Sequence, residues 1–139
     1  MIGILIIAHG SLGESLIQCA SHVMGKRPHQ LEYLAVSIQD DPPSLLITAQ
    51  AMVTKLNDGH GVLVLSDIYG ATPCNMVTKL VNQEGVAGVA GVNLPMLVRV
   101  LNYRQESLET CIDKAISGGR EGVVHFTKEG CNHHTPPKP

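Results

Sequence analysis

Two segments of the chain contain no polar residue, and this limits the fold more than any other feature of the sequence. They are Ile2–Ala8 and Val62–Leu65. A strand with one face in water alternates apolar and polar residues, whereas a strand covered on both faces is apolar throughout. We therefore expect both segments to be strands of a parallel sheet with helices packed on its two faces.

Signals for helix starts occur between the predicted strands. Ser11 and Glu14 have the spacing of a capping box, in which each side chain bonds to the backbone of the other residue. Asp41, Thr72 and Asn93 each stand one or two residues before a proline, as N-cap residues commonly do. These signals predict four helices that follow the strands.

Glycines and apolar runs complete the predicted elements. Helices are expected to stop at Gly25 and at Gly118–Gly119, and further strands are expected at Leu31–Ile38, Val86–Val92 and Val123–Phe126. Because strands alternate with helices, the sequence predicts an α/β fold. We expect an open, mainly parallel four-stranded sheet in a flavodoxin-like order, with helices on both faces and the short C-terminal strand added.

Length and composition suggest one domain followed by a tail. The 139 residues are enough for a single core, and only 3% are aromatic, so aliphatic side chains must fill that core. We expect a domain over residues 1–128. Residues 129–139 contain three prolines and two adjacent histidines and are expected to be a flexible tail.

Several function classes are excluded by the sequence. Ten basic against twelve acidic residues give a net charge of −2 without a basic block, which argues against nucleic acid. No apolar run reaches the ~20 residues of a membrane span, and the four scattered cysteines suggest reduced thiols in the cytoplasm. The P-loop, dinucleotide-binding and nucleophile-elbow motifs are absent.

Candidate chemistry lies where two predicted strands end. His9 follows the first strand and Asp67 follows the third, and a flavodoxin-like order makes these strands neighbours. A carboxylate on one ring nitrogen would orient His9 as a nucleophile and stabilise the charge that develops on attack. The alternative is structural, with His9 bonded to a backbone carbonyl and Asp67 serving as a turn or cap residue.

The surroundings of His9 suit an anion. Two predicted helices begin near it, and helix N-termini offer unpaired N–H groups and a positive dipole end. Gly10 and Gly70 allow close approach, and Thr72 is either a hydroxyl donor or only an N-cap. Cys74 is interpreted as a lining residue, and the remaining six histidines have ordinary structural or solvent-exposed explanations.

Four segments resemble the IIA component of the mannose class of the bacterial sugar phosphotransferase system. The resemblance covers roughly residues 2–126. The segments are Ala8–Gly10, Asp67–Asn75, Ala90–Leu97 and Gly119–Val123. One departure lies in the second segment, where the family's usual Trp-Gly-Gly-Ser-Pro appears as Tyr69-Gly70-Ala71-Thr72-Pro73.

The resemblance implies a transient phosphohistidine at His9. In this family the phosphoryl group comes from the phosphocarrier HPr and passes to a IIB domain, Asp67 matches the paired carboxylate, and Thr72 matches a hydroxyl that contacts the phosphoryl group. The family sheet ends in an antiparallel strand that is usually exchanged in a homodimer, here Val123–Phe126. Contact with the membrane would be indirect, through IIC and IID components.

The expected site follows from the strand ends and the resemblance together. His9 accepts and donates the phosphoryl group, and Asp67 orients it. The expected phosphoryl-binding residues are Gly10, Ser11, Gly70 and Thr72. The expected pocket lining is Tyr69, Pro73, Cys74, Asn75, Asn93, Pro95 and Met96. No cofactor or metal is expected.

Two other roles fit the same His9 chemistry. One is a regulatory module that HPr phosphorylates and that signals by binding other proteins instead of feeding sugar transport. The other is a IIA-like domain that donates to a dihydroxyacetone kinase system. The sequence does not identify a sugar, because in this system sugar specificity belongs to the membrane components.

Overall fold

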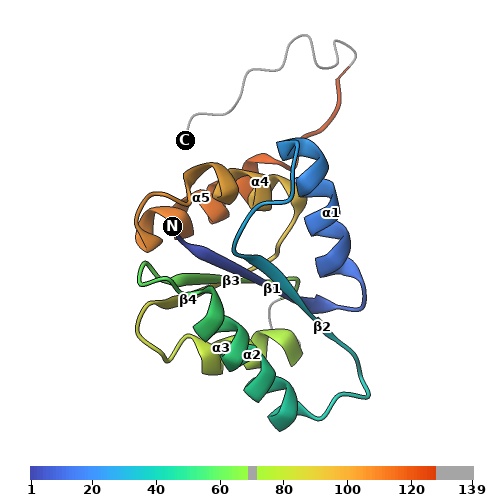
Figure 1. Cartoon of the computed structure of the whole chain (residues 1–139). Helices are drawn as coiled ribbons and strands as arrows, with labels where there is room; N and C mark the ends of the chain where they lie inside the picture. Colours follow the sequence, from blue (N-terminus) through green and yellow to red (C-terminus); the bar gives the residue numbers. More distant parts are fainter. Residues whose placement is uncertain (69–71, 128–139) are drawn as a thin grey trace.

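A computed structural model of the chain describes residues 1–68 and 72–127 and contains one four-stranded sheet (Figure 1). The strand order is β2-β1-β3-β4, and every neighbouring pair is parallel. This confirms the α/β class and the neighbouring positions of the first and third strands. The strands are β1 (Gly3–His9), β2 (Leu31–Val36), β3 (Val62–Ser66) and β4 (Val86–Ala90).

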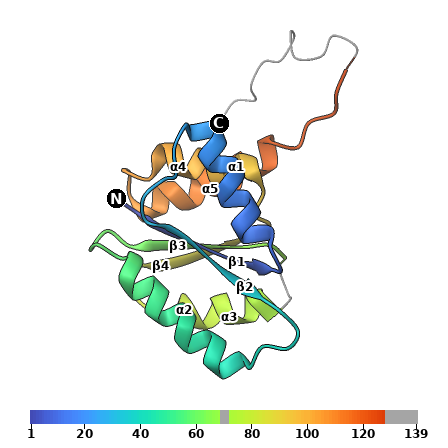
Figure 2. The same ribbon diagram turned by 45° about the vertical axis from the view of Figure 1, so that its right-hand side comes forward.

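Helices cover both faces of the sheet, as Figure 2 shows. Helices α1, α4 and α5 lie on one face and α2 and α3 on the other. Their bounds are α1 (Leu12–Met24), α2 (Pro42–Leu56), α3 (Thr72–Leu80), α4 (Leu94–Tyr103) and α5 (Leu108–Glu121). Within the described ranges, none of these helices has the length and apolarity to cross a membrane.

Strand β1 contributes to two separate cores. Ile4 and Ile6 belong to the core beneath α1, α4 and α5, whereas Leu5 and Ile7 belong to the core beneath α2 and α3. All four side chains are fully buried. Because consecutive side chains of a strand point to opposite faces, a strand buried on both faces has no position for a polar residue.

The structure confirms two predicted N-cap residues and one predicted helix stop. The Asp41 carboxylate accepts a hydrogen bond from the Ser44 amide at the start of α2, and Asn93 accepts one from the Met96 amide at the start of α4. Gly25 ends α1 with a φ of 83°, in the left-handed region that glycine adopts without strain.

The prediction that Gly118–Gly119 ends the last helix was wrong. Helix α5 continues to Glu121, and both glycines are buried where it packs on α4. A Cβ atom on Gly118 would lie 2.9 Å from the Cβ of Arg99, and one on Gly119 would lie 2.8 Å from the Cε of Met96. These glycines therefore allow two helices to approach closely and do not break one.

The strand predicted at Val123–Phe126 does not form within the single chain. Residues 123–127 lie outside any strand and lead away from the folded body, with Phe126 80% exposed (Figure 1). A strand needs a partner for its backbone hydrogen bonds, and no strand of the same chain pairs with this segment in the described ranges. The predicted tail, 129–139, lies outside the described residues.

Arg104 joins three elements at the amino ends of the strands. It follows α4 and is 5% exposed. Its guanidinium donates to the carbonyl of Ile2, just before β1, and to those of His29 and Gln30, just before β2, over 2.6 to 3.0 Å. The Ile2 amide in turn donates to the Arg104 carbonyl.

We expect Arg104→Met to lower the free energy of unfolding by about 2–4 kcal/mol, because buried carbonyls lose charged donors. Urea denaturation followed by circular dichroism measures this change. Arg27→Met is the control: exposed Arg27 gives only one hydrogen bond to a backbone carbonyl, that of Leu31 at 3.2 Å, and its ion pair with Glu32 is worth at most about 1 kcal/mol, so its loss should be smaller. Equal losses of unfolding free energy in the two variants would contradict a stabilising role of the buried Arg104 hydrogen bonds.

Candidate functional site

His9 and Asp67 meet at the carboxyl ends of β1 and β3. Strand β1 ends at His9, and Asp67 directly follows Ser66, the last residue of β3. The register pairs Ile7 with Ser66, so the next residues of the two strands continue side by side. The Asp67 Oδ2 atom lies 2.8 Å from His9 Nδ1 and accepts the His9 backbone N–H at 3.0 Å.

This contact determines which ring nitrogen of His9 carries the lone pair. A carboxylate accepts hydrogen bonds, so Nδ1 keeps its proton toward Asp67, and the lone pair of the neutral ring is on Nε2. The His9 side chain is 44% exposed, whereas that of Asp67 is 9% exposed. A partner molecule therefore has access to the histidine, while the carboxylate is protected behind it.

Two opposing effects act on the pKa of Asp67, and the net direction is downward. Burial raises the pKa because it disfavours the charged carboxylate. Hydrogen bonds from the backbone and ring of His9 and from the Ile68 amide outweigh that effect, and attraction to His9 adds to them. Asp67 is thus held ionised, as an orienting group for an imidazole must be.

Gly10 and Ser11 connect the end of β1 to helix α1. Gly10 has a φ of +56°, and its amide donates to the carbonyl of Val36, the last residue of β2. Ser11 occupies the N-cap position, but its side chain makes no capping bond. The predicted capping box is therefore wrong: the Glu14 carboxylate accepts a hydrogen bond from the Tyr33 hydroxyl at 2.6 Å instead.

The sequence missed this contact because Tyr33 lies 19 residues away, on β2. No local pattern signals a hydrogen bond between a helix and a strand. The spacing of Ser11 and Glu14 predicts a local pair, whereas in the structure Glu14 bonds to Tyr33 on β2.

The second predicted helix terminus is described only in part. Helix α3 begins at Thr72, and Asn75 in this helix is exposed. Tyr69 and Gly70 lie outside the described residues, as do the side chains of Thr72, Pro73 and Cys74. Their roles in the site stay predictions.

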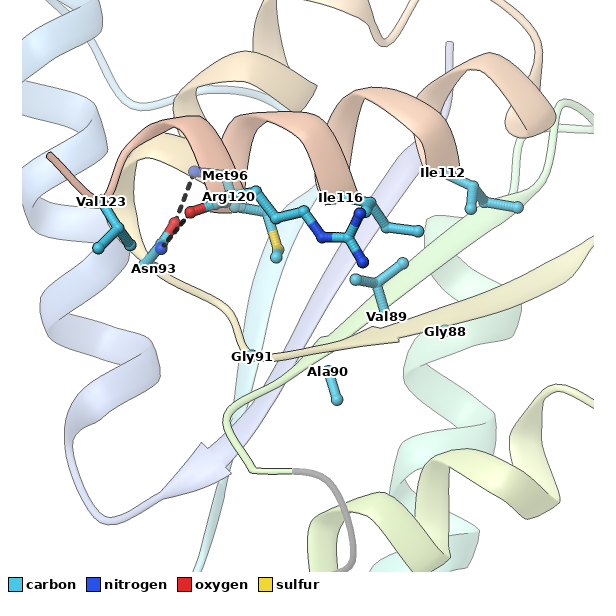
Figure 3. A pocket seen from close by; sticks show the side chains of 11 residues that line it. Gly88, Val89, Ala90, Gly91, Asn93, Met96, Ile112, Ile116, Arg120 and Val123 are labelled. Atoms are coloured by element: carbon cyan, nitrogen blue, oxygen red, sulfur yellow. Dashed lines mark hydrogen bonds between the residues drawn. The ribbon is translucent and has the colours of Figure 1, made fainter.

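Asn93, Pro95 and Met96 are engaged in the contact between α4 and α5. Asn93 accepts from the Met96 amide at 2.9 Å and donates to the Gly119 carbonyl at 3.1 Å, as drawn in Figure 3. Pro95 lies where a Cβ atom on Gly122 would collide with it. The structure thus shows a structural role for these residues, and their place in a phosphoryl pocket remains a prediction.

A cavity of about 610 Å³ lies between β4 and α5, beside Asn93 and Met96. Figure 3 shows the Arg120 side chain extending along α5 toward Ile116, above Val89 of β4. The floor is strand β4, and Val123 lies at one end of the cavity. Strand β4 is the edge strand of the sheet on this side.

A second Asp–His pair lies elsewhere on the molecule. The Asp58 Oδ1 atom is 2.8 Å from His60 Nδ1, in the turn between α2 and β3. This turn is at the amino ends of the strands, away from His9. Among the described residues, no group of three or more histidine, cysteine or acidic side chains is arranged to hold a metal ion.

Comparison with known proteins identifies relatives over most of the chain. A family model described as "PTS system fructose IIA component" (EIIA-man) matches residues 3–116. The mannose-specific EIIAB component of Escherichia coli K12 is 32% identical over 125 residues, which are 88% of this chain and 38% of that protein. The chain thus spans little more than a third of that relative. The fructose-specific EIIA component of Bacillus subtilis is 28% identical over 109 residues, 76% of this chain and 72% of that protein.

Solved structures agree with the fold. The phosphotransferase system component EIIA of Streptococcus agalactiae superposes with a TM-score of 0.80 at 26% identity, over 90% of this chain and 97% of that one. The mannose/sorbose-specific IIA subunit of Enterococcus faecalis gives a TM-score of 0.80 at 19% identity, over 91% and 95% of the two chains, and supports the fold alone. The fold is therefore that of the IIA components of the phosphotransferase system. The chain belongs to the mannose class of this IIA family.

Asp67 adds a pH dependence to the stability of the protein. Its folded-state pKa lies below the ordinary value of about 3.9, so it stabilises the fold above that pH and this contribution is lost as pH falls through the folded pKa. We expect Asp67→Asn to lose less unfolding free energy than the wild type between about pH 5 and pH 3. Urea denaturation at the two pH values measures the difference.

Asp58→Asn is the positive control for this measurement. Hydrogen bonds from His60 and from the N-terminal amine lower the pKa of Asp58. Replacing the Asp58 carboxylate should also reduce the loss of unfolding free energy as the pH falls. If Asp67→Asn loses as much unfolding free energy as the wild type between about pH 5 and pH 3, this would contradict an ionised, hydrogen-bonded Asp67.

Proposed function

We propose that the protein is a phosphocarrier that accepts a phosphoryl group from phospho-HPr on His9 and passes it to a IIB component. The observation that carries this proposal is the 2.8 Å contact between His9 Nδ1 and Asp67, which leaves the lone pair on Nε2 of an accessible ring. Membership of the mannose-class IIA family supports the same role. The proposed location of the protein is the cytoplasm.

The transfer requires one bond to form and one to break. The Nε2 lone pair of His9 attacks the phosphorus atom, and the bond from phosphorus to the donor nitrogen of HPr breaks, with its electron pair returning to that nitrogen. No proton needs to leave His9, because Nδ1 keeps its hydrogen toward Asp67. The carboxylate stabilises the positive charge that the ring acquires. Transfer to IIB repeats the same exchange with His9 as the donor.

The protein contributes mainly position and charge stabilisation to this step. Gly10 and Ser11 place the N-terminus of α1 directly after His9, with no side chain capping it. Backbone N–H groups there can bind the oxygens of the phosphoryl group. The proposal assigns the same kind of role to Gly70 and Thr72 at the start of α3.

Exposed aliphatic side chains around His9 suit the docking of protein partners. Leu12 begins α1, Ile68 follows Asp67, and Ile38 lies two residues beyond Val36, the β2 residue paired with His9. All three are exposed, and Ile38 is 99% exposed. We assign this surface to contact with HPr and with IIB, which would use it in turn.

The relatives favour transport over the two alternatives. The E. coli and B. subtilis proteins are named as mannose- and fructose-specific components, and these names belong to sugar-specific transport. No described feature favours the regulatory module or the dihydroxyacetone kinase donor. Any contact with a membrane would then be through IIC and IID components, with residues 1–128 as the phosphocarrier domain.

We expect His9→Ala to abolish labelling by phospho-HPr, because the attacking nitrogen is lost. Incubation with radioactively phosphorylated HPr and acid-sensitive labelling of the protein measure this. His60→Ala is the matched control, since His60 also pairs with an aspartate at 2.8 Å but lies at the other end of the sheet. It should label like the wild type.

Asp67→Ala tests the orienting role in the same assay. Transfer should slow by about tenfold to a hundredfold, the usual effect of losing a carboxylate that orients a functional histidine, while the fold is retained. Label that persists in His9→Ala, or label that disappears in His60→Ala, would refute the assignment of His9. Unchanged kinetics in Asp67→Ala would refute only the role of the pair.

We also propose a homodimer in which residues 123–126 of each copy extend the other copy's sheet. Strand β4 is an edge strand, and the cavity beside it includes Gly88–Gly91 and Val123. The segment after α5 exposes Val123, Val124 and Phe126, an apolar surface that a single chain leaves uncovered. Adding a strand to an open edge would satisfy its backbone and bury these side chains.

Val124→Pro tests this dimer. A proline removes one backbone donor and disfavours strand pairing, so the variant should shift toward monomer, whereas Val124→Ala keeps the donor and should stay dimeric. Light scattering after size-exclusion chromatography measures the mass. A wild-type monomer, or a fully dimeric Val124→Pro, would contradict the exchange.

A further inference from the structure

We propose that Tyr33 is a positioning residue that holds the Glu14 carboxylate away from the N-terminus of α1 and so keeps that terminus open for the phosphoryl group on His9. This inference rests on the proposed function, because it concerns the same site. It assigns a role to a strand residue and a helix residue that lie outside the His9–Asp67 pair.

The sequence at the start of α1 favours a different arrangement. Ser11 is the N-cap and Glu14 is the third helical residue, the two positions of a capping box. In that box Glu14 would accept from the Ser11 amide and Ser11 from the Glu14 amide. In the structure the Ser11 side chain makes no capping bond, and Glu14 Oε2 accepts from the Tyr33 hydroxyl at 2.6 Å.

Tyr33 reaches Glu14 because the helix and the strand approach closely. Tyr33 pairs with Ile6 in the sheet and packs against the core beneath α1. A Cβ atom on Gly13 would lie 2.9 Å from the Tyr33 Cβ and 3.4 Å from Ile6 Cγ2. The absence of a side chain at Gly13 thus lets the tyrosine lie against the first turn of α1, with its hydroxyl beside Glu14.

The hydrogen bond also affects the tyrosine. Glu14 raises the pKa of Tyr33, first through this hydrogen bond and then through its negative charge. Tyr33 therefore remains a neutral donor, which is the form that can hold a carboxylate.

The Glu14 carboxylate and a phosphoryl group on His9 would compete for the backbone N–H groups at the start of α1. The first N–H groups of a helix have no partner within the helix and attract anions. A Glu14 carboxylate folded back on the N-cap would occupy a donor directly beside His9 and would repel a phosphoryl group that carries negative charge. Held at Tyr33, the same carboxylate leaves these donors to the transferred group.

The experiment compares Tyr33→Phe, Glu14→Ala and the double variant with the wild type. Rates of labelling at His9 are measured with phospho-HPr and with phosphoramidate, a small donor whose P–N bond breaks as ammonia leaves and the bond to Nε2 forms. We expect Tyr33→Phe to be about fivefold slower with both donors, the effect of one competing cap. Glu14→Ala should label within about twofold of the wild type.

The double variant decides the matter. Without the carboxylate there is nothing for Tyr33 to hold, so the proposal requires Tyr33→Phe combined with Glu14→Ala to regain nearly the wild-type rate with both donors. A double variant as slow as Tyr33→Phe would overturn the proposal and indicate a merely structural tie between α1 and β2. Wild-type rates in Tyr33→Phe would overturn it as well.

Failure of the proposed function gives a different result. If His9 is not the acceptor, the wild type itself takes no label at His9 from either donor, and both proposals fall together. If the wild type labels and His9→Ala does not, the phosphocarrier role stands whatever the Tyr33 variants do. Urea denaturation of each variant confirms that a slow rate comes from a folded protein.

Discussion

The burial of β1 on both faces is the constraint on which the rest of the structure depends. Its side chains fill two cores at once, so helices must cover both sides of the sheet. Parallel neighbours then need crossover helices, and all carboxyl ends of the strands meet at one edge. The central pair of the proposed chemistry follows from this arrangement, because β1 ends at His9 and Asp67 directly follows the end of β3, the neighbouring central strand.

The two ends of the sheet have opposite tasks. At the amino ends, Arg104 is buried and its guanidinium donates four hydrogen bonds to backbone carbonyls, which ties the starts of β1 and β2 to the end of α4. At the carboxyl ends, His9 is accessible, and the N-terminus of α1 has no side-chain cap. A buried side chain thus joins the elements at one edge, and backbone donors at the start of α1 stay without a side-chain cap at the other, which suits the proposed phosphoryl site.

Two helix caps were predictable from local patterns, and the distant His9–Asp67 contact was predictable from the expected strand order, whereas the Tyr33–Glu14 contact was not. Asp41 and Asn93 cap helices through amides three residues away, so a short pattern contains both partners. Glu14 has an equally good local partner, yet Tyr33 on β2 takes its carboxylate. The pair Gly118–Gly119 resembles a helix stop in the sequence. Its actual cause is the close contact with α4, which requires small residues and which the sequence does not show.

The sequence by itself determined the α/β class, most helix starts and the placing of His9 and Asp67 at strand ends, because apolar runs and caps act over a few residues. Only the tertiary structure decided how these residues interact. It showed that Nδ1 of His9 faces Asp67 and that Glu14 turns to Tyr33. It also left residues 123–127 outside the sheet, because a strand requires a partner and no strand in the described ranges of the chain pairs with this segment. Periodicity specifies which face of an element is buried, whereas the partner of each polar group depends on which elements the fold brings together.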